Sequence, residues 1–118
     1  MEESNFEIIF YEDNKGEIPV KDFIDSLNGK MRAKVALALE QLSIEGNYIR
    51  EPYSKHLEDG IFELRVKVSN NQLRILYFFF IGKRVVLTNG FIKKKNSIDR
   101  KHIKLAKKRR NHYIERSK

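Results

Sequence analysis

Apolar residues at the start of the chain predict a strand followed by a helix. The segment 6–11 (FEIIFY), apolar apart from Glu7, is typical of a strand, and the polar segment 12–16 after it indicates a turn. Pro19 suits the first turn of a helix. The apolar residues that follow at helical spacing are Val20, Phe23, Ile24 and Leu27.

A second helix is predicted after the helix-breaking pair Asn28-Gly29. It begins near Lys30, and Gly46 is a suitable residue to end it. Its apolar stripe consists of Met31, Val35, Ala38, Leu39 and Leu42. We expect both helices to use their stripes to pack against a sheet.

The apolar residues at every second position of the segment 62–81, on either side of Asn70-Asn71, predict a β-hairpin. Asn tolerates positive φ, so Asn70-Asn71 is expected to form the turn, which places Lys67 opposite Arg74. One face is then apolar apart from Tyr77 and carries Phe62, Leu64, Val66, Val68, Leu73, Ile75, Tyr77, Phe79 and Ile81. The other face is polar and then apolar, with Glu63, Arg65, Lys67, Ser69, Gln72, Arg74, Leu76, Phe78 and Phe80.

A second hairpin is predicted with its turn at Gly82-Lys83. The expected pairs are Ile81 with Arg84, Phe78 with Leu87, Arg74 with Phe91, and Gln72 with Lys93. The strand around Arg74 is apolar on much of both faces, which indicates the centre of the sheet.

A final basic helix is expected from about Asp99 to Tyr113, capped by Asp99 or Ser97. The residues expected to dock it are Ile103, Ala106 and Tyr113. The pattern therefore predicts an α+β fold in one domain, residues 1–118. Its order is an N-terminal strand, two helices, an antiparallel three-strand meander joined to the first strand, and a C-terminal basic helix.

Charge is divided unevenly along the chain. Residues 1–64 hold 7 Lys/Arg and 14 Asp/Glu, a net charge of −7, whereas residues 65–118 hold 17 and 2, a net charge of +15. Such asymmetry is typical of a protein with a polyanionic partner, and nucleic acid is the most common one. A solvated basic face, or one that meets an acidic protein, explains the charge equally well.

Several classes of protein are disfavoured by composition. The chain has no Cys, which excludes disulfides, thiolate metal sites and a cysteine nucleophile, and suits a reducing cytoplasm. The acidic start Met1-Glu2-Glu3 is unlike a signal peptide, and no apolar run approaches the roughly 18 residues of a membrane span. His102 and His112 are ten residues apart, so we expect no metal site and no cofactor.

The predicted register gathers four cations on one face of the sheet: Arg65, Lys67, Arg74 and Lys93. We expect no acidic residue between them, because Glu63 lies one pair further along. Uncompensated positive charge on rigid strands favours an anion site, and the alternative is an ordinary solvent-exposed sheet face. Since Arg74 points away from the apolar face, we expect its replacement by Ala to cost within about 1 kcal/mol of stability.

Further cations are candidates for contacts with RNA or the ribosome. They are Lys55, Lys94, Lys95, Lys101, Lys104 and Lys108. Strand alternation places Lys95 on the same face as Lys93 and turns Lys94 away, and the basic helix could equally be solvated or bind an acidic partner. His56 is a candidate general base, although a surface histidine explains it as well.

Several motifs, in order, resemble the phage-associated HigB branch of the RelE/ParE superfamily of type II toxins. They are residues 51–57 (EPYSKHL), 60–65 (GIFELR), 73–77 (LRILY) and 90–94 (GFIKK), with residues 16–20 (GEIPV) upstream and Ala106 in a basic helix downstream. The resemblance covers most of the chain. One departure is Ser97-Ile98-Asp99, where the family often has Lys-Thr-Pro.

The resemblance implies a RelE-like fold and a ribosome-dependent mRNA endoribonuclease that inhibits translation. Its cleavage needs no metal, because the RNA 2′-OH attacks the adjacent phosphorus and leaves a 2′,3′-cyclic phosphate. By position, the catalytic residues would be Arg65, Lys67, Arg74 and Lys93, with the arginines stabilising the phosphate and a lysine of lowered pKa transferring a proton. No catalytic Tyr aligns, so the general base stays open.

The implied partners are mRNA, the ribosome and a cognate antitoxin of the helix-turn-helix, HigA-like kind, in the cytoplasm. Two alternatives remain. A ParE-like protein shares the fold but poisons DNA gyrase and needs no cation cluster. A non-catalytic nucleic-acid-binding domain would place stacking aromatics beside the cations, and only Phe91 fits that pattern.

Overall fold

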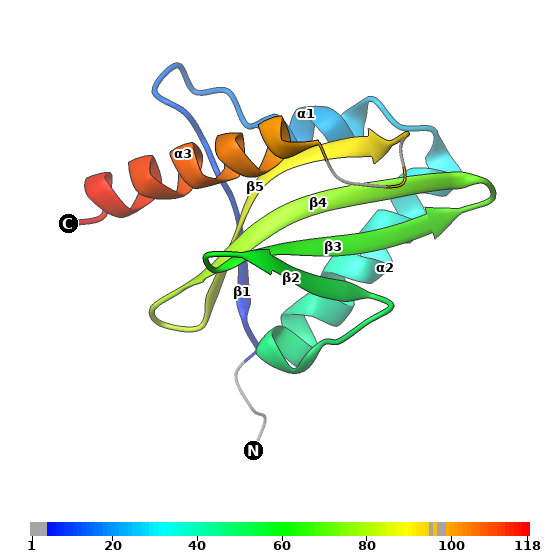
Figure 1. Ribbon diagram of the computed structural model, residues 1–118, viewed down its shortest axis with the longest axis horizontal. Coiled ribbons are helices and arrows are strands. Elements are labelled where there is room, and N and C mark those ends of the chain that lie inside the picture. Colours follow the sequence, from blue (N-terminus) through cyan, green and yellow to red (C-terminus); the bar gives the residue numbers. More distant parts are fainter. Residues whose placement is uncertain (1–4, 95, 97–98) are drawn as a thin grey trace.

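A five-stranded mixed sheet forms the centre of the computed structural model, which describes residues 5–94, 96 and 99–118. The strands are β1 (Glu7–Phe10), β2 (Ser54–Glu58), β3 (Ile61–Val68), β4 (Asn71–Phe80) and β5 (Arg84–Lys93). They lie in the order β1-β5-β4-β3-β2, with β1 parallel to β5 and every other pair antiparallel (Figure 1). The α+β fold expected from the sequence is confirmed, and the edge strand β2 is an addition to it.

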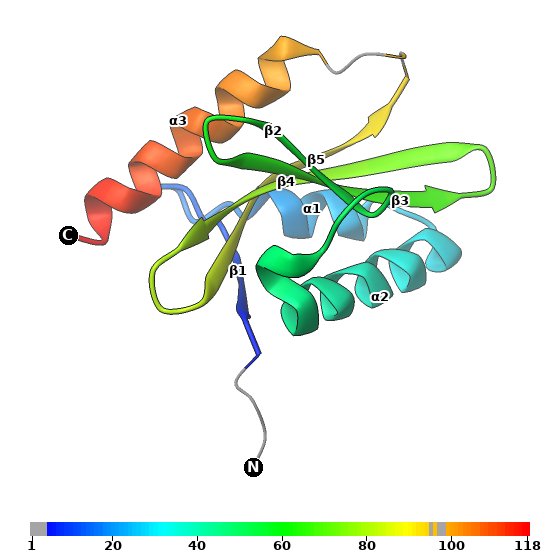
Figure 2. The same cartoon turned by 60° about the horizontal axis from the view of Figure 1, so that its bottom comes forward.

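Helices cover both faces of the sheet. They are α1 (Pro19–Asp25), α2 (Gly29–Glu45) and α3 (Arg100–Arg116), and a 3₁₀ turn, Gly46–Tyr48, follows α2. Figure 2 shows α2 on one side of the sheet and α3 on the other. None of the helices in the described part of the chain is long and apolar enough to span a membrane.

Two apolar cores follow from this layering. The larger contains Val35 and Leu42 of α2 together with Leu64 and Ile75 of the sheet. The smaller lies beneath α3 and contains Leu76, Phe78, Val86, Ala106 and Tyr113. Strand β4 contributes to both cores, which confirms that it is central.

The helix boundaries follow the local signals in the sequence. Pro19 begins α1, and the side chain of Asn28 accepts a hydrogen bond from the Met31 N–H at 2.9 Å, which caps α2. Gly46 ends α2 with φ at +53°, a conformation that favours glycine. Asp99 caps α3 by accepting from the Lys101 N–H at 3.1 Å, and the other expected cap, Ser97, lies outside the described residues.

The first hairpin turns one residue earlier than the sequence indicated. Val68 pairs with Asn71, so the turn is Ser69-Asn70, and Ser69 takes the positive φ of +56°. A turn displaced by one residue shifts the pairing by two, and side chains repeat every two residues along a strand. Both faces were therefore predicted correctly, but Arg74 lies opposite Arg65 and not opposite Lys67.

The second hairpin has a three-residue loop, residues 81–83, because Phe80 pairs with Arg84. The expected pairs of Ile81 with Arg84 and Phe78 with Leu87 are wrong, and Ile81 is 76% exposed. A bulge at Thr88 then adds one residue to β5 and restores the expected register, so Arg74 pairs with Phe91 and Gln72 with Lys93.

Gly90 allows α1 to approach β5 closely, which gives a first prediction. A Cβ atom at this position would lie 2.4 Å from Cδ2 of Phe23. We expect Gly90→Ala to lower the free energy of unfolding by about 1–3 kcal/mol, because the packed ring must move. Denaturant unfolding followed by circular dichroism measures this. In the matched control Gly29→Ala the new Cβ is 3.9 Å from its nearest neighbour, Arg32, so stability equal in the two variants would contradict the prediction.

Candidate functional site

Four cations lie on the α3 side of the sheet, toward the β3–β4 turn. Arg65 pairs with Arg74, and Lys67 and Lys93 flank Gln72 on its two neighbouring strands. Figures 1 and 2 show the β3–β4 hairpin extending beyond α3, so the helix leaves this end of the face uncovered. The placement of the four cations on one face is therefore as expected, whereas their chemical roles stay predictions.

Glu63 neutralises part of this charge, contrary to the expectation that no acid intervenes. Its side chain is only 2% exposed, and Oε1 accepts a hydrogen bond from Nε of Arg65 at 3.0 Å. The other oxygen, Oε2, lies 3.4 Å from Nε of Arg74. A carboxylate one residue pair away reaches both guanidinium groups because the side chains of neighbouring pairs on one face are in contact range.

Arg74 is buried, with an exposed fraction of 6%. Its Nη1 donates to Oε1 of Gln72 at 3.2 Å and to the carbonyl of Leu73 at 3.1 Å. Its Nε makes no hydrogen bond despite the nearby Glu63, and no described residue accepts from Nη2. Because a buried cation held by a buried carboxylate is costly to remove, we now expect the loss of Arg74 to cost more than the roughly 1 kcal/mol expected from the sequence.

Burial also changes the proton affinity of this guanidinium. Desolvation lowers the pKa of Arg74 from its ordinary value, Glu63 opposes this, and Arg65 adds to it. A desolvated guanidinium with a free N–H is strongly attracted to an anion. The structure therefore holds Arg74 in a rigid position and leaves one donor nitrogen for a ligand.

A hollow of about 330 Å³ lies beside Arg74. It is lined by Gln72, Arg74, Lys93, Lys94 and Asn96. The expectation that Lys94 turns away from this face is wrong, because β5 ends at Lys93 and strand alternation ends with it. Lys95, the other candidate in this run, lies outside the described residues, and Lys67 is exposed and does not line the hollow.

The remaining candidate cations are spread over the surface. Lys55 is exposed on the edge strand β2, where it pairs with Glu63. Lys101, Lys104 and Lys108 are exposed along α3, and Lys101 has Asp99 at 4.0 Å. None of these four lines the hollow at Arg74.

Other cations of α3 anchor the helix and are not available to a partner. Arg100 and Lys107 contact Glu58 at 2.7 and 2.5 Å, and Arg110 binds Asp59. The hydrogen bonds from Arg100 and then Lys107 lower the pKa of Glu58 to about 2. Because this carboxyl has a depressed pKa in the folded state, its contribution to stability persists at neutral pH and is lost as the pH falls toward about 2.

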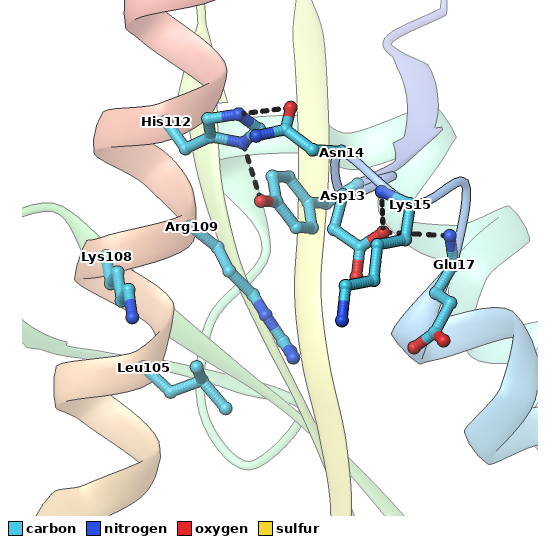
Figure 3. A pocket seen from close by; sticks show the side chains of 9 residues that line it. Asp13, Asn14, Lys15, Glu17, Leu105, Lys108, Arg109 and His112 are labelled. Carbon is cyan, nitrogen blue, oxygen red and sulfur yellow. Dashed lines mark hydrogen bonds between the residues drawn. The ribbon is translucent and has the colours of Figure 1, made fainter.

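A second pocket, of about 440 Å³, lies between α3 and the loop that follows β1 (Figure 3). His112 lies at its rim, where Nδ1 is 2.7 Å from the Tyr11 hydroxyl and Nε2 is 3.0 Å from Oδ1 of Asn14. Arg109 enters the same pocket and donates to the Thr88 carbonyl at 2.8 Å. Both ring nitrogens of His112 are thus engaged in holding α3 against this loop.

A stacked pair of rings lies beside the cations, and only one of its two members, Phe91, was singled out from the sequence. Phe91, which pairs with Arg74, lies flat against the imidazole of His102, with ring centroids 3.6 Å apart and an interplanar angle of 1°. Helical periodicity does not indicate which strand residue the His102 side chain contacts. Within the described residues no group of three or more His, Asp or Glu side chains is arranged to hold a metal ion.

The chain belongs to the family of phage-derived Gp49-like proteins, whose family model matches residues 22–111. This is a RelE-type, toxin-like family. The match includes α2, all of strands β2 to β5 and most of α3, and hence every described cation of the candidate site. No curated protein matches the chain significantly in sequence.

Proposed function

We propose that the protein is the toxin of a type II toxin–antitoxin system, of the HigB-like branch, and that it cleaves mRNA on the ribosome. The observation that carries the proposal is Arg74, a buried guanidinium with an unused N–H beside a hollow lined by Lys93 and Lys94. Burying a cation this deeply costs free energy, and a fold that only needed stability would be served as well by apolar residues. A phosphate group is an anion of suitable size for such a hollow, and RNA supplies phosphates at regular spacing.

In the proposed reaction the 2′-oxygen of a nucleotide attacks the adjacent phosphorus, and the 5′-oxygen of the next nucleotide leaves. Negative charge accumulates on the phosphorane oxygens, where Arg74 and Lys93 donate hydrogen bonds. Donors fixed in advance stabilise such charge more than flexible ones do, because no reorganisation is needed during the reaction. Glu63 supplies this rigidity by holding Arg65 and Arg74.

Induction of the protein alone in bacteria tests the proposal. We expect growth to stop within about one generation, because ribosomes stall on cut messages. Typical enzyme turnover, about 1 per second or faster, is sufficient for this effect. Primer extension should show new 5′ ends inside translated regions, and an inhibitor of initiation should abolish them. Unaffected growth with abundant folded protein would contradict the toxin function. DNA breaks and an SOS response without RNA cuts would favour the ParE-like alternative instead.

The partner is proposed to be an antitoxin with an acidic segment. The exposed side of α3 presents Lys101, Lys104 and Lys108, and among the described residues only Lys101 of these three forms an ion pair, with Asp99 at 4.0 Å. We expect a heterocomplex with the neighbouring antitoxin whose dissociation constant rises with salt, because exposed charge pairs are screened. Titration calorimetry at low and high ionic strength measures this. Affinity independent of salt would show an apolar interface and contradict the charge argument.

A further inference from the structure

His102 is held next to the cation cluster by contacts on two sides. Its ring stacks on Phe91 at 3.6 Å, and its backbone carbonyl accepts a hydrogen bond from Nδ2 of Asn89 at 3.2 Å. Phe91 is the β5 partner of Arg74 on the same face of the sheet. Directly paired residues have Cβ atoms about 5 Å apart, so the imidazole is fixed one side chain away from the buried guanidinium.

Of the three histidines, only His102 has both ring nitrogens free of hydrogen bonds within the described residues. His112 uses both nitrogens, on Tyr11 and Asn14. His56 accepts a hydrogen bond from the Gly60 N–H through Nε2 at 3.1 Å. A general base needs an unoccupied lone pair, and the parallel stack on Phe91 fixes the ring plane through one ring face without engaging either nitrogen.

The charges around His102 favour the neutral imidazole. Burial is the main cause that lowers the pKa of His102 from 6.5, Lys101 adds to the effect, and Asp99 opposes it. Arg74 and Lys93, on the sheet face beside α3, are also positive. At neutral pH the ring is therefore in the form that accepts a proton.

We infer that His102 is the general base of the proposed RNA cleavage, an assignment that rests on the proposed function. The imidazole accepts the proton of the nucleotide 2′-OH as the oxygen–phosphorus bond forms. The bond from phosphorus to the 5′-oxygen breaks, and that oxygen takes a proton from the Lys93 ammonium or from water. The imidazolium lies over the Phe91 ring, which stabilises it until it loses the proton to solvent.

The test compares wild type with His102→Gln in ribosome-bound mRNA cleavage at saturating protein, as a function of pH. For wild type we expect the cleavage rate to rise about tenfold per pH unit below the pKa of His102, which lies below 6.5, and to level off above that pKa. His102→Gln should cut about a hundredfold more slowly and lose this acidic limb. The matched control is His112→Gln, on the same helix but at the other pocket, which should keep both the rate and the limb.

Chemical rescue separates proton transfer from a purely structural role. Added imidazole should restore part of the activity of His102→Ala, because the small base enters the space left by the ring. A folded His102→Gln with wild-type rate and pH profile would overturn the inference, as would a His102→Ala protein that imidazole does not rescue. If the variants fail to fold, a wild-type profile with no acidic limb would still overturn it. A wild-type protein that cuts no RNA would overturn the proposed function itself, which is a distinguishable result.

Discussion

Arg74→Ala is expected to slow ribosome-bound mRNA cleavage by at least about a hundredfold, a loss of roughly 3 kcal/mol of transition-state stabilisation. The physical reason is that the alanine variant loses the fixed N–H beside the hollow, and a mobile water cannot replace it without reorganisation. The same substitution should also lower the free energy of unfolding by about 2 kcal/mol or more, because it leaves Glu63 buried with one guanidinium partner in place of two.

A conservative variant separates these two effects. Arg74→Lys keeps a positive charge near Glu63 and should stay close to wild type in thermal melts. It loses the planar fork of donors, so we expect cleavage to fall at least about tenfold. Lys104→Ala, on the exposed side of α3, is the matched control and should leave the rate at saturating protein unchanged. A folded Arg74→Lys protein that cuts at the wild-type rate would show that Arg74 only holds the sheet together.

Local patterns in the sequence were sufficient to predict every helix and strand except the edge strand β2, and to predict the faces of the sheet. Pro19, Asn28, Gly46 and Asp99 are signals that act within a few residues, and each has the structural role expected of its type. The assignment of side chains to faces was also correct, because an error of one residue in the turn shifts the pairing by two and preserves the face.

The exact register could not be predicted, because the features that decide it are weak in sequence. Ser69 is a less typical residue for positive φ than Asn71, yet Ser69 adopts it. The three-residue loop 81–83 and the bulge at Thr88 compensate each other, so the pair Arg74–Phe91 was predicted correctly from a partly wrong hairpin. Nothing in the local sequence signals that the longer loop and the bulge occur together.

The candidate site was predicted in its composition but not in its electrostatics. Arg65, Lys67, Arg74 and Lys93 were placed on one face from strand alternation alone. The role of Glu63 depends on how far three side chains extend and bend toward one another, which alternation does not specify. His102 was missed for a related reason: its contact with Phe91 depends on how α3 is positioned on the sheet.

Glu63 is therefore expected to be the most sensitive polar residue of the sheet. Glu63→Gln keeps the shape of the side chain but removes the charge that faces Arg65 and the buried Arg74. We expect the free energy of unfolding to fall by about 3 kcal/mol, because an unpaired buried cation retains its full desolvation cost. Denaturant unfolding at neutral pH measures the change.

Glu51→Gln is the matched control for this carboxylate. Glu51 also faces Arg65, at 3.6 Å, but its side chain is 63% exposed, so its loss should cost less than about 1 kcal/mol.

The double variant Glu63→Leu with Arg74→Met should be more stable than Glu63→Gln alone, because it removes the buried charges together and fills the space with apolar atoms. A double variant that is inactive but stable is the expected result if this buried pair exists for the site. Equal stability of Glu63→Gln and Glu51→Gln would contradict the pairing and, with it, the rigidity attributed to Arg74.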